Sequence, residues 1–89
     1  MDFDWDERKR ASNLEKHGLD FADVAFLAWE MARVLIDDRQ DYGEVRYRAM
    51  GLFKGRLHFV AFTLRGDKIR LISFRKANEK EVKRYGQEK

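Results

Sequence analysis

Two short turns divide the second half of the chain into three strand-like segments. The turns are Lys54-Gly55 and Gly66-Asp67, and glycine at such positions is typical of β-hairpins. The segments around them, residues 45–53, 57–65 and 68–75, are rich in β-branched and aromatic residues, as strands are. Because so short a turn can join only antiparallel neighbours, the pattern predicts a three-stranded antiparallel meander.

The rest of the chain adds a strand before the meander and helices at both ends, and the alternation of acidic and aromatic residues from Asp2 to Trp5 suggests a further short strand at the start. Residues 32–37 have the composition of a strand that precedes the meander. Capping residues and helical spacing predict three helices, from Asp6 to His17, from Asp20 to Trp29, and from Asn78 onward. A chain of 89 residues has room for one hydrophobic core. We therefore expect a single α+β domain over residues 1–89, with an antiparallel sheet of about four strands, two N-terminal helices and a C-terminal helix.

The turns also determine which side chains share a face of the sheet. Arg65 is expected opposite Lys68 across the second turn, and Leu52 opposite Leu57 across the first. One face is then almost wholly apolar and should carry the helices; it collects Val45, Tyr47, Ala49, Val60, Phe62, Leu64, Ile69 and Leu71. The other face has Met50, Leu52, Phe59, Ala61, Ile72 and Phe74 toward one end, and Glu44, Arg46, Arg48, Thr63, Arg65, Lys68 and Arg70 toward the other.

The five cations of this second face indicate a ligand that carries phosphate. Like charges on neighbouring strands repel each other, so clustering them adds no stability without an anion. Guanidinium groups bind phosphate through paired hydrogen bonds and can hold the charge that develops when a phosphoryl group is transferred. The alternative interpretation is a solvated face whose charge is balanced by Glu44, Asp41 and Asp67.

Two further basic residues follow at the end of the last strand. Arg75 is expected on the core side, opposite His58, where it can reach past the sheet edge to a phosphate or to the carbonyl groups of a helix end. Lys76 is expected on the other side, where it extends the basic face. Both interpretations stay open for each of them.

Three further side chains are weighed by their position. His17 lies in the last turn of the first predicted helix, where an imidazole interacts favourably with the helix dipole; in a functional role it would be a general acid or base. His58, between Leu57 and Phe59, is interpreted as a structural strand residue. Tyr85 is expected to pack its ring while its hydroxyl reaches solvent or the site.

Several classes of function are excluded or disfavoured. The absence of cysteine excludes disulfides and thiolate metal sites, and the two histidines lack zinc-site spacing. The chain has no glycine-rich phosphate loop and no apolar run of roughly 18 to 20 residues that a membrane span requires. A net charge of +3 is consistent with binding nucleic acid. We expect a cytoplasmic protein without metal or cofactor.

Three segments resemble the BrnT family of bacterial type II toxins: WDERKRASNLEKHG, DYGEVRYRAMG and FTLRGDKIRLISFRKANEKEVKRY. The resemblance extends along nearly the whole chain. Its marks, in order, are Trp5-Asp6, Lys9, Asn13, Lys16-His17-Gly18, Gly43-Glu44, Arg46, Thr63, Arg65-Gly66, Arg70, Ile72-Ser73, Arg75, Ala77, Glu81 and Tyr85. It implies a RelE-like fold and a ribonuclease that cuts RNA and arrests translation. It also implies a small ribbon-helix-helix antitoxin, similar to BrnA, that joins the toxin in a heterotetramer and contacts operator DNA for the pair.

The leading hypothesis is an endoribonuclease that needs no metal and uses the RNA 2′-hydroxyl to attack the adjacent phosphate. The expected catalytic residues are Glu44, Arg46, Arg65, Arg70, Arg75, His17 and Tyr85, and the expected RNA-binding residues are Lys16, Arg48, Lys68 and Lys76. Glu44 or His17 would be the base, and Tyr85 or a lysine the acid. For Lys16, His17, Arg75 and Tyr85 these roles rest mainly on the resemblance. The alternatives are a non-catalytic module that grips RNA or an acidic protein, and a face that mainly receives the antitoxin.

Overall fold

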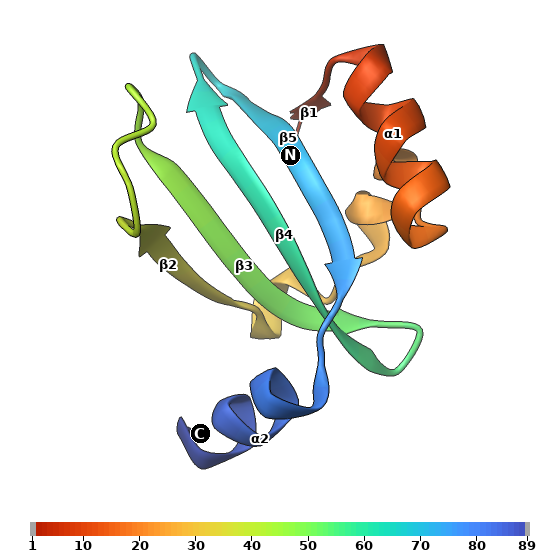
Figure 1. Cartoon of the computed structure of the whole chain (residues 1–89), viewed down its shortest axis with the longest axis vertical. Coiled ribbons are helices and arrows are strands. Elements are labelled where there is room, and N and C mark those ends of the chain that lie inside the picture. Colours follow the sequence, from red (N-terminus) through yellow and green to blue (C-terminus); the bar gives the residue numbers. More distant parts are fainter. Residues whose placement is uncertain (1, 89) are drawn as a thin grey trace.

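A five-stranded sheet with helices at both ends of the chain forms the protein (Figure 1). The computed structural model describes residues 2–88. The elements in chain order are β1 (Asp2–Asp4), α1 (Glu7–His17), the short 3-10 helices η1 (Phe21–Phe26) and η2 (Trp29–Met31), β2 (Arg33–Asp37), β3 (Arg46–Phe53), β4 (Arg56–Arg65), β5 (Lys68–Lys76) and α2 (Glu79–Glu88). The predicted α+β class is confirmed, and the second predicted helix is two 3-10 helices instead.

The strands are ordered β1-β5-β4-β3-β2, and all neighbours are antiparallel except β1 and β5, which are parallel. The sheet is therefore mixed and one strand wider than the antiparallel sheet of about four strands that the sequence predicts. The register between β3 and β4 is as predicted, with Leu52 opposite Leu57 and Met50 opposite Phe59.

A β-bulge in β5 changes the predicted faces. Lys68 to Leu71 pair with β4 as expected, but the register then shifts so that Ser73 lies opposite Ala61. Ile72 is the extra residue, and a bulge of this kind reverses the inside and outside positions that follow it. Phe74 is therefore opposite Val60 in the core instead of on the basic face.

The two cations after the bulge exchange faces for the same reason. Arg75 is paired with Phe59 on the second face, not with His58 on the core side, and Lys76 takes the position opposite His58. Both placements made from the alternating pattern were wrong.

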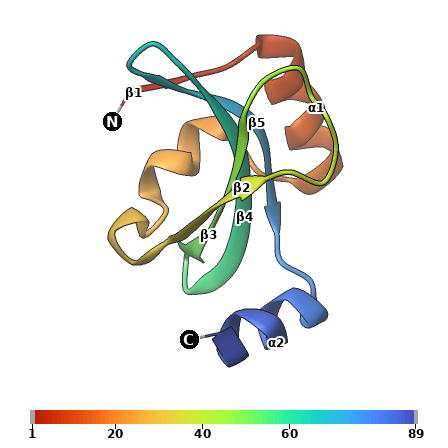
Figure 2. The same ribbon diagram turned by 90° about the vertical axis from the view of Figure 1, so that its left-hand side faces the viewer.

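The core lies between one face of the sheet and η1. Phe21 and Val24 of η1, and Leu27 directly after it, are buried against β3, β4 and β5, where Val60 and Phe74 have no exposed surface. Figure 2 shows η1 on one side of the sheet, and the loop between β2 and β3 together with α2 on the other. The second face is thus bordered by the 38–45 loop and α2, and much of its charge remains accessible.

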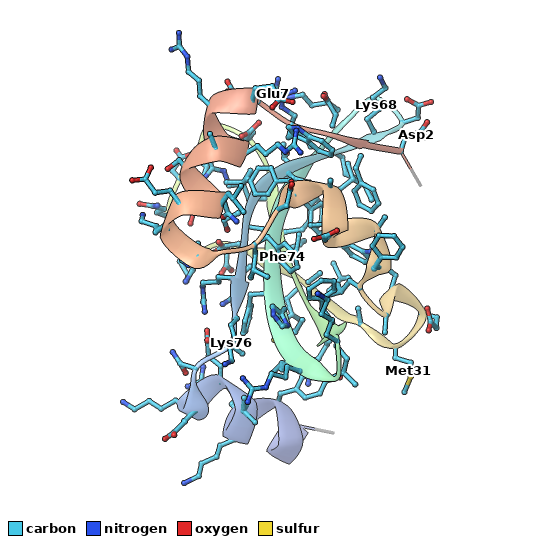
Figure 3. The ribbon with its side chains drawn as sticks, turned by 90° about the vertical axis from the view of Figure 1, so that its right-hand side faces the viewer. Asp2, Glu7, Met31, Lys68, Phe74 and Lys76 are labelled. Carbon is cyan, nitrogen blue, oxygen red and sulfur yellow. The ribbon has the colours of Figure 1, made fainter. Side chains whose placement is uncertain are left out.

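Helix α1 lies along the edge of β5 and is held there by one side-chain amide. The Asn13 side chain is buried; its Nδ2 donates to the Phe74 carbonyl at 2.8 Å, and the Phe74 N–H donates to its Oδ1 at 3.0 Å. The same Nδ2 donates to the Leu19 carbonyl at 3.0 Å. Asn13 therefore pairs with the strand edge beyond the reach of β1, as another strand would. In Figure 3, Phe74 lies between α1 and η1.

Helix α2 covers the end of the second face that lies farthest from β1. It is capped by reciprocal hydrogen bonds between Asn78 and Glu81, a capping box. Beneath it, Met50, Leu57 and Phe59 form a small apolar cluster that Ala77 and Tyr85 complete. This group of five residues is called the α2 cluster below. None of the described helices is long and apolar enough to cross a membrane.

Replacing Asn13 with leucine should lower the free energy of unfolding by about 2–4 kcal/mol, since it leaves the N–H and C=O of Phe74 buried without partners. Urea denaturation followed by tryptophan fluorescence measures this. The matched control is Leu14→Gln on the exposed side of the same helix, where we expect a change within about 0.5 kcal/mol. Equal stabilities for the two variants would contradict the role given to Asn13.

Candidate functional site

A polar cavity of about 160 Å³ opens where α1, the 38–45 loop and the second face meet. We call it the arginine cavity; it is lined by Asp6, Lys9, Glu44, Thr63, Arg65, Arg70, Leu71 and Ile72. Glu44, Arg65 and Arg70 come from three separate segments of the chain and were placed together by strand register alone. The structure brings all three to one cavity, with Arg46 beside them.

The position of Glu44 is set by hydrogen bonds in the 38–45 loop. Asp37, whose side chain is 5% exposed, accepts hydrogen bonds from Arg39 and from the Tyr42 hydroxyl. The Thr63 hydroxyl donates to the carbonyl of Val45 at 2.6 Å. The loop is thereby fastened on both sides of Glu44.

Glu44 is paired only loosely with its neighbouring cations. Its carboxylate oxygens are 3.6 Å from Arg46 Nε and 3.9 Å from Arg65 Nη2, which is outside hydrogen-bonding range. The Arg46 guanidinium also lies over the Tyr42 ring, 4.1 Å from its centre. Within residues 2–88 the Glu44 carboxylate has no hydrogen bond, so both of its oxygens can accept one from a ligand.

Arg70 has a closer partner in β1. Its Nη1 donates to Asp4 Oδ2 at 2.8 Å, and this hydrogen bond is the main reason why the pKa of Asp4 lies below its usual value. The bond holds the Arg70 guanidinium group next to β1. Arg70 also contributes to lowering the pKa of Asp6, after the N–H of Arg8, which donates to that carboxylate at the N-terminus of α1.

A second polar cavity, of about 190 Å³, adjoins the first. It is called the α1 cavity and is lined by Lys9, Ser12, Asn13, Lys16, His17, Ile72 and Ser73. Lys9 and Ile72 line both cavities. Lys16 and His17, predicted from the resemblance, are therefore neighbours of the arginine cavity without lining it.

The remaining predicted site residues line neither of these two cavities. Arg75 donates to both oxygens of Glu81 at 2.8 Å and covers the Phe59 ring; these hydrogen bonds raise the pKa of Arg75 and lower that of Glu81. Tyr85 belongs to the α2 cluster. Arg48 is near enough to Glu81 to help lower its pKa.

The two lysines of β5 are at opposite ends of that strand, as Figure 3 shows. Lys68 is exposed at the turn opposite Arg65. Lys76 lines an open groove of about 690 Å³ between α2 and the end of the β3–β4 hairpin. Neither lines the arginine cavity.

Comparison with known families decides what kind of protein this is. The sequence model of one family, described as "Ribonuclease toxin, BrnT, of type II toxin-antitoxin system", matches residues 5–81, which includes every residue that lines the two polar cavities. The chain belongs to the BrnT family. No individual curated protein matches the chain.

Membership in the BrnT family implies an RNA substrate and a protein antitoxin as partner. The family description names no residues that act on the RNA, so each residue role given above remains a prediction. Within residues 2–88 no group of three or more potential metal-ligating side chains is present.

Lys9 lines both cavities, and the sequence pattern assigned it no role. It entered only as a mark of the resemblance. A signal was available, since Lys9, Asn13 and Lys16 are four and three residues apart and so share one side of a helix. Once Asn13 is fixed against β5, both lysines must border the same strand.

Acid should destabilise the protein. The pKa values of Asp4, Asp20, Asp37 and Glu81 are all lowered in the folded state, chiefly by hydrogen bonds from arginine side chains. A carboxylate with a lowered pKa contributes stability that is present above its unfolded pKa and is lost as the pH falls through its folded pKa. We therefore expect the free energy of unfolding to begin to fall near the usual values, 3.8 for Asp and 4.5 for Glu.

Urea denaturation at a series of pH values tests this. An Asp37→Asn variant should lose less stability on acidification than the wild type, because the carboxylate with four hydrogen bonds has been removed. A wild type that becomes more stable in acid would contradict the expectation.

Proposed function

We propose that the protein is an endoribonuclease that cuts RNA in the arginine cavity without a metal ion. One observation supports this proposal most strongly. Glu44, whose carboxylate has no hydrogen bond within residues 2–88, lines the same small cavity as Arg65 and Arg70. This combination supplies a base and a phosphate-binding group side by side. The proposal concerns mechanism, since ribonuclease activity itself follows from the family.

In this mechanism the 2′-oxygen of the RNA bonds to the adjacent phosphorus while the bond from phosphorus to the 5′-oxygen breaks. Glu44 takes the proton of the 2′-hydroxyl, and the leaving 5′-oxygen takes up a proton from water or from a lysine. The products are a 2′,3′-cyclic phosphate and a 5′-hydroxyl. Arg65 and Arg70 hold the phosphate and its developing charge, and Arg46 lies beside Glu44, with its Nε 3.6 Å from the carboxylate.

The positions of His17, a candidate base, and of Tyr85, a candidate acid, bear on the choice of both groups. His17 lines the α1 cavity, and Tyr85 packs in the α2 cluster, so neither lines the cavity where Glu44 meets the arginines. Glu44 is therefore the preferred base. Arg75, Arg48, Lys68 and Lys76 do not line this cavity, and the proposal gives them at most contacts with more distant parts of an RNA chain.

We also propose that the protein acts in the cytoplasm, has a RelE-like fold and is neutralised by a ribbon-helix-helix antitoxin similar to BrnA in a heterotetramer. Operator DNA would be contacted only through the antitoxin. The resemblance of the sequence to BrnT proteins supports these points. Coexpression with the antitoxin, followed by measurement of the mass of the complex, tests the expected two-plus-two composition.

Glu44→Gln should slow RNA cleavage by at least about 100-fold, since it removes the proposed base while keeping the shape of the side chain. Arg65→Gln should cause a loss of similar size by removing a phosphate ligand. Glu79→Gln, an exposed carboxylate on α2, is the matched control and should cut at the wild-type rate. Thermal melting confirms that each variant is folded.

The assay is run in EDTA, and the fragment ends are identified by mass spectrometry. Cyclic phosphate ends with full wild-type activity are the expected result. Activity that disappears in EDTA, or a Glu44→Gln variant as active as the control, would overturn the mechanism.

One observation favours a second candidate, a surface that binds RNA without cutting it. Arg70 already has a carboxylate partner at 2.8 Å, and Glu44 lies between Arg46 and Arg65, so the cluster is partly balanced within the chain. The same assay separates the two, because binding alone leaves the RNA intact. If the face mainly receives the antitoxin, the same variants would lose the complex instead of the cleavage.

A further inference from the structure

The two polar cavities adjoin each other, and together they are called the trough below. They share Lys9 from α1 and Ile72 from the β5 bulge. One end of the trough holds Glu44, Arg65 and Arg70, and the other holds Lys16 and His17. A ligand longer than a single phosphate group can therefore extend from one cavity into the other.

The two cavities differ in their charges. Two carboxylates, from Asp6 and Glu44, line the arginine cavity, whereas no carboxylate lines the α1 cavity. Apart from Ile72 and the structural Asn13, five side chains line the α1 cavity. They carry two ammonium groups, two hydroxyl groups and one imidazole, from Lys9, Lys16, Ser12, Ser73 and His17. All of these can donate a hydrogen bond to an anion.

The positive charges of Lys9 and Lys16 have no ion-pair partner within the described part of the chain. Arg10 on the same helix is paired with Asp20 at 2.8 Å, and Arg75 with Glu81. In residues 2–88, by contrast, neither Lys9 nor Lys16 has an ion pair or a side-chain hydrogen bond. Their charges are free to meet an anion from outside.

The framework that places them is rigid. Asn13 lies between Lys9 and Lys16 in sequence and is buried against Phe74 by two hydrogen bonds, so this side of α1 cannot rotate away from β5. At 1.5 Å of rise per residue, the two lysines are about 10 Å apart along the helix axis. Ile72 at the β5 bulge and Ser73 after it line the α1 cavity together with both lysines.

We propose that the α1 cavity is a second phosphate subsite, which binds the RNA backbone phosphate next to the one that is cut, and that Lys9 contacts the RNA between the two subsites. This inference rests on the proposed function, which puts the scissile phosphate in the arginine cavity. The ligand is the phosphodiester backbone, since five side chains of the cavity can donate to phosphate oxygens, whereas a single ring, the imidazole of His17, stands in its lining. RNA substrates must then carry a phosphate beside the scissile one for efficient cleavage.

Binding tests the subsite separately from catalysis. The probe is a fluorescent single-stranded DNA oligonucleotide, which has the phosphates but lacks the attacking 2′-hydroxyl. For Lys9→Gln and Lys16→Gln, the slope of log affinity against log salt should become shallower by about 0.7 each, because one phosphate contact is lost. The matched control is Lys80→Gln, an exposed lysine on α2, which should keep the wild-type slope.

Cleavage of short oligonucleotides with a single ribonucleotide tests the second phosphate directly. A dinucleotide has only the scissile phosphate, whereas two trinucleotides carry an additional phosphate on its 5′ or on its 3′ side. We expect one trinucleotide to be cut at least about tenfold faster than the dinucleotide by the wild type, and this advantage to be lost in Lys9→Gln with Lys16→Gln.

The outcomes separate this inference from the proposed function. If the wild type binds DNA with the expected lysine-dependent slope but Glu44→Gln still cuts RNA, the subsite stands and the assignment of the base fails. If the lysine variants keep both the wild-type slope and the wild-type preference for trinucleotides, or if the wild type does not bind the oligonucleotide, the subsite is overturned.

Discussion

The hydrogen bonds between Asn13 and Phe74 are the interaction on which the rest of this structure depends. They place α1 beside the one stretch of β5 that β1 does not reach, directly after the bulge at Ile72. Both polar cavities lie along this junction, because Lys9 of α1 and Ile72 of the bulged strand line each of them. A helix interior is an unfavourable place for asparagine, and its presence there is explained by the two strand-edge groups that it satisfies.

Several arginines can lie close together around the arginine cavity in the absence of a ligand, because carboxylates of the same chain partly balance their charge. Asp4 holds Arg70 by a direct hydrogen bond, while Glu44 is only loosely associated with Arg46 and Arg65. A phosphate can therefore approach Arg65 without first displacing a tight ion pair. The α1 cavity has no such balance, so its lysines should contribute more to binding than to stability. The two halves of the trough thus suit different tasks, chemistry in one and attachment of the substrate in the other.

The sequence was sufficient to predict those features that short turns determine. Two hairpin turns fix the register of β3 with β4, and of β4 with the first half of β5, and this register was enough to gather Glu44, Arg65 and Arg70 on one face. The sequence was insufficient to predict the register of β5 beyond Leu71. Ile72 and Phe74 are both apolar, so the pattern is compatible with a regular strand or with a bulge. Tertiary packing decides between them: a bulge lets Phe74 enter the core beside Val60. The parallel pairing of β1 and the capture of β5 by Asn13 depend on contacts between distant segments, which no local pattern contains.

The central claim is that phosphate binds where Glu44 meets Arg65 and Arg70. NMR spectroscopy of the side-chain Nε–H groups of arginine, during titration with a DNA oligonucleotide that cannot be cut, tests it most directly. We expect the signals of Arg65 and Arg70 to shift first and together, while that of Arg75, already bound to Glu81, changes little. Shifts confined to Arg75 and its neighbours near α2, with Arg65 and Arg70 unmoved, would contradict it.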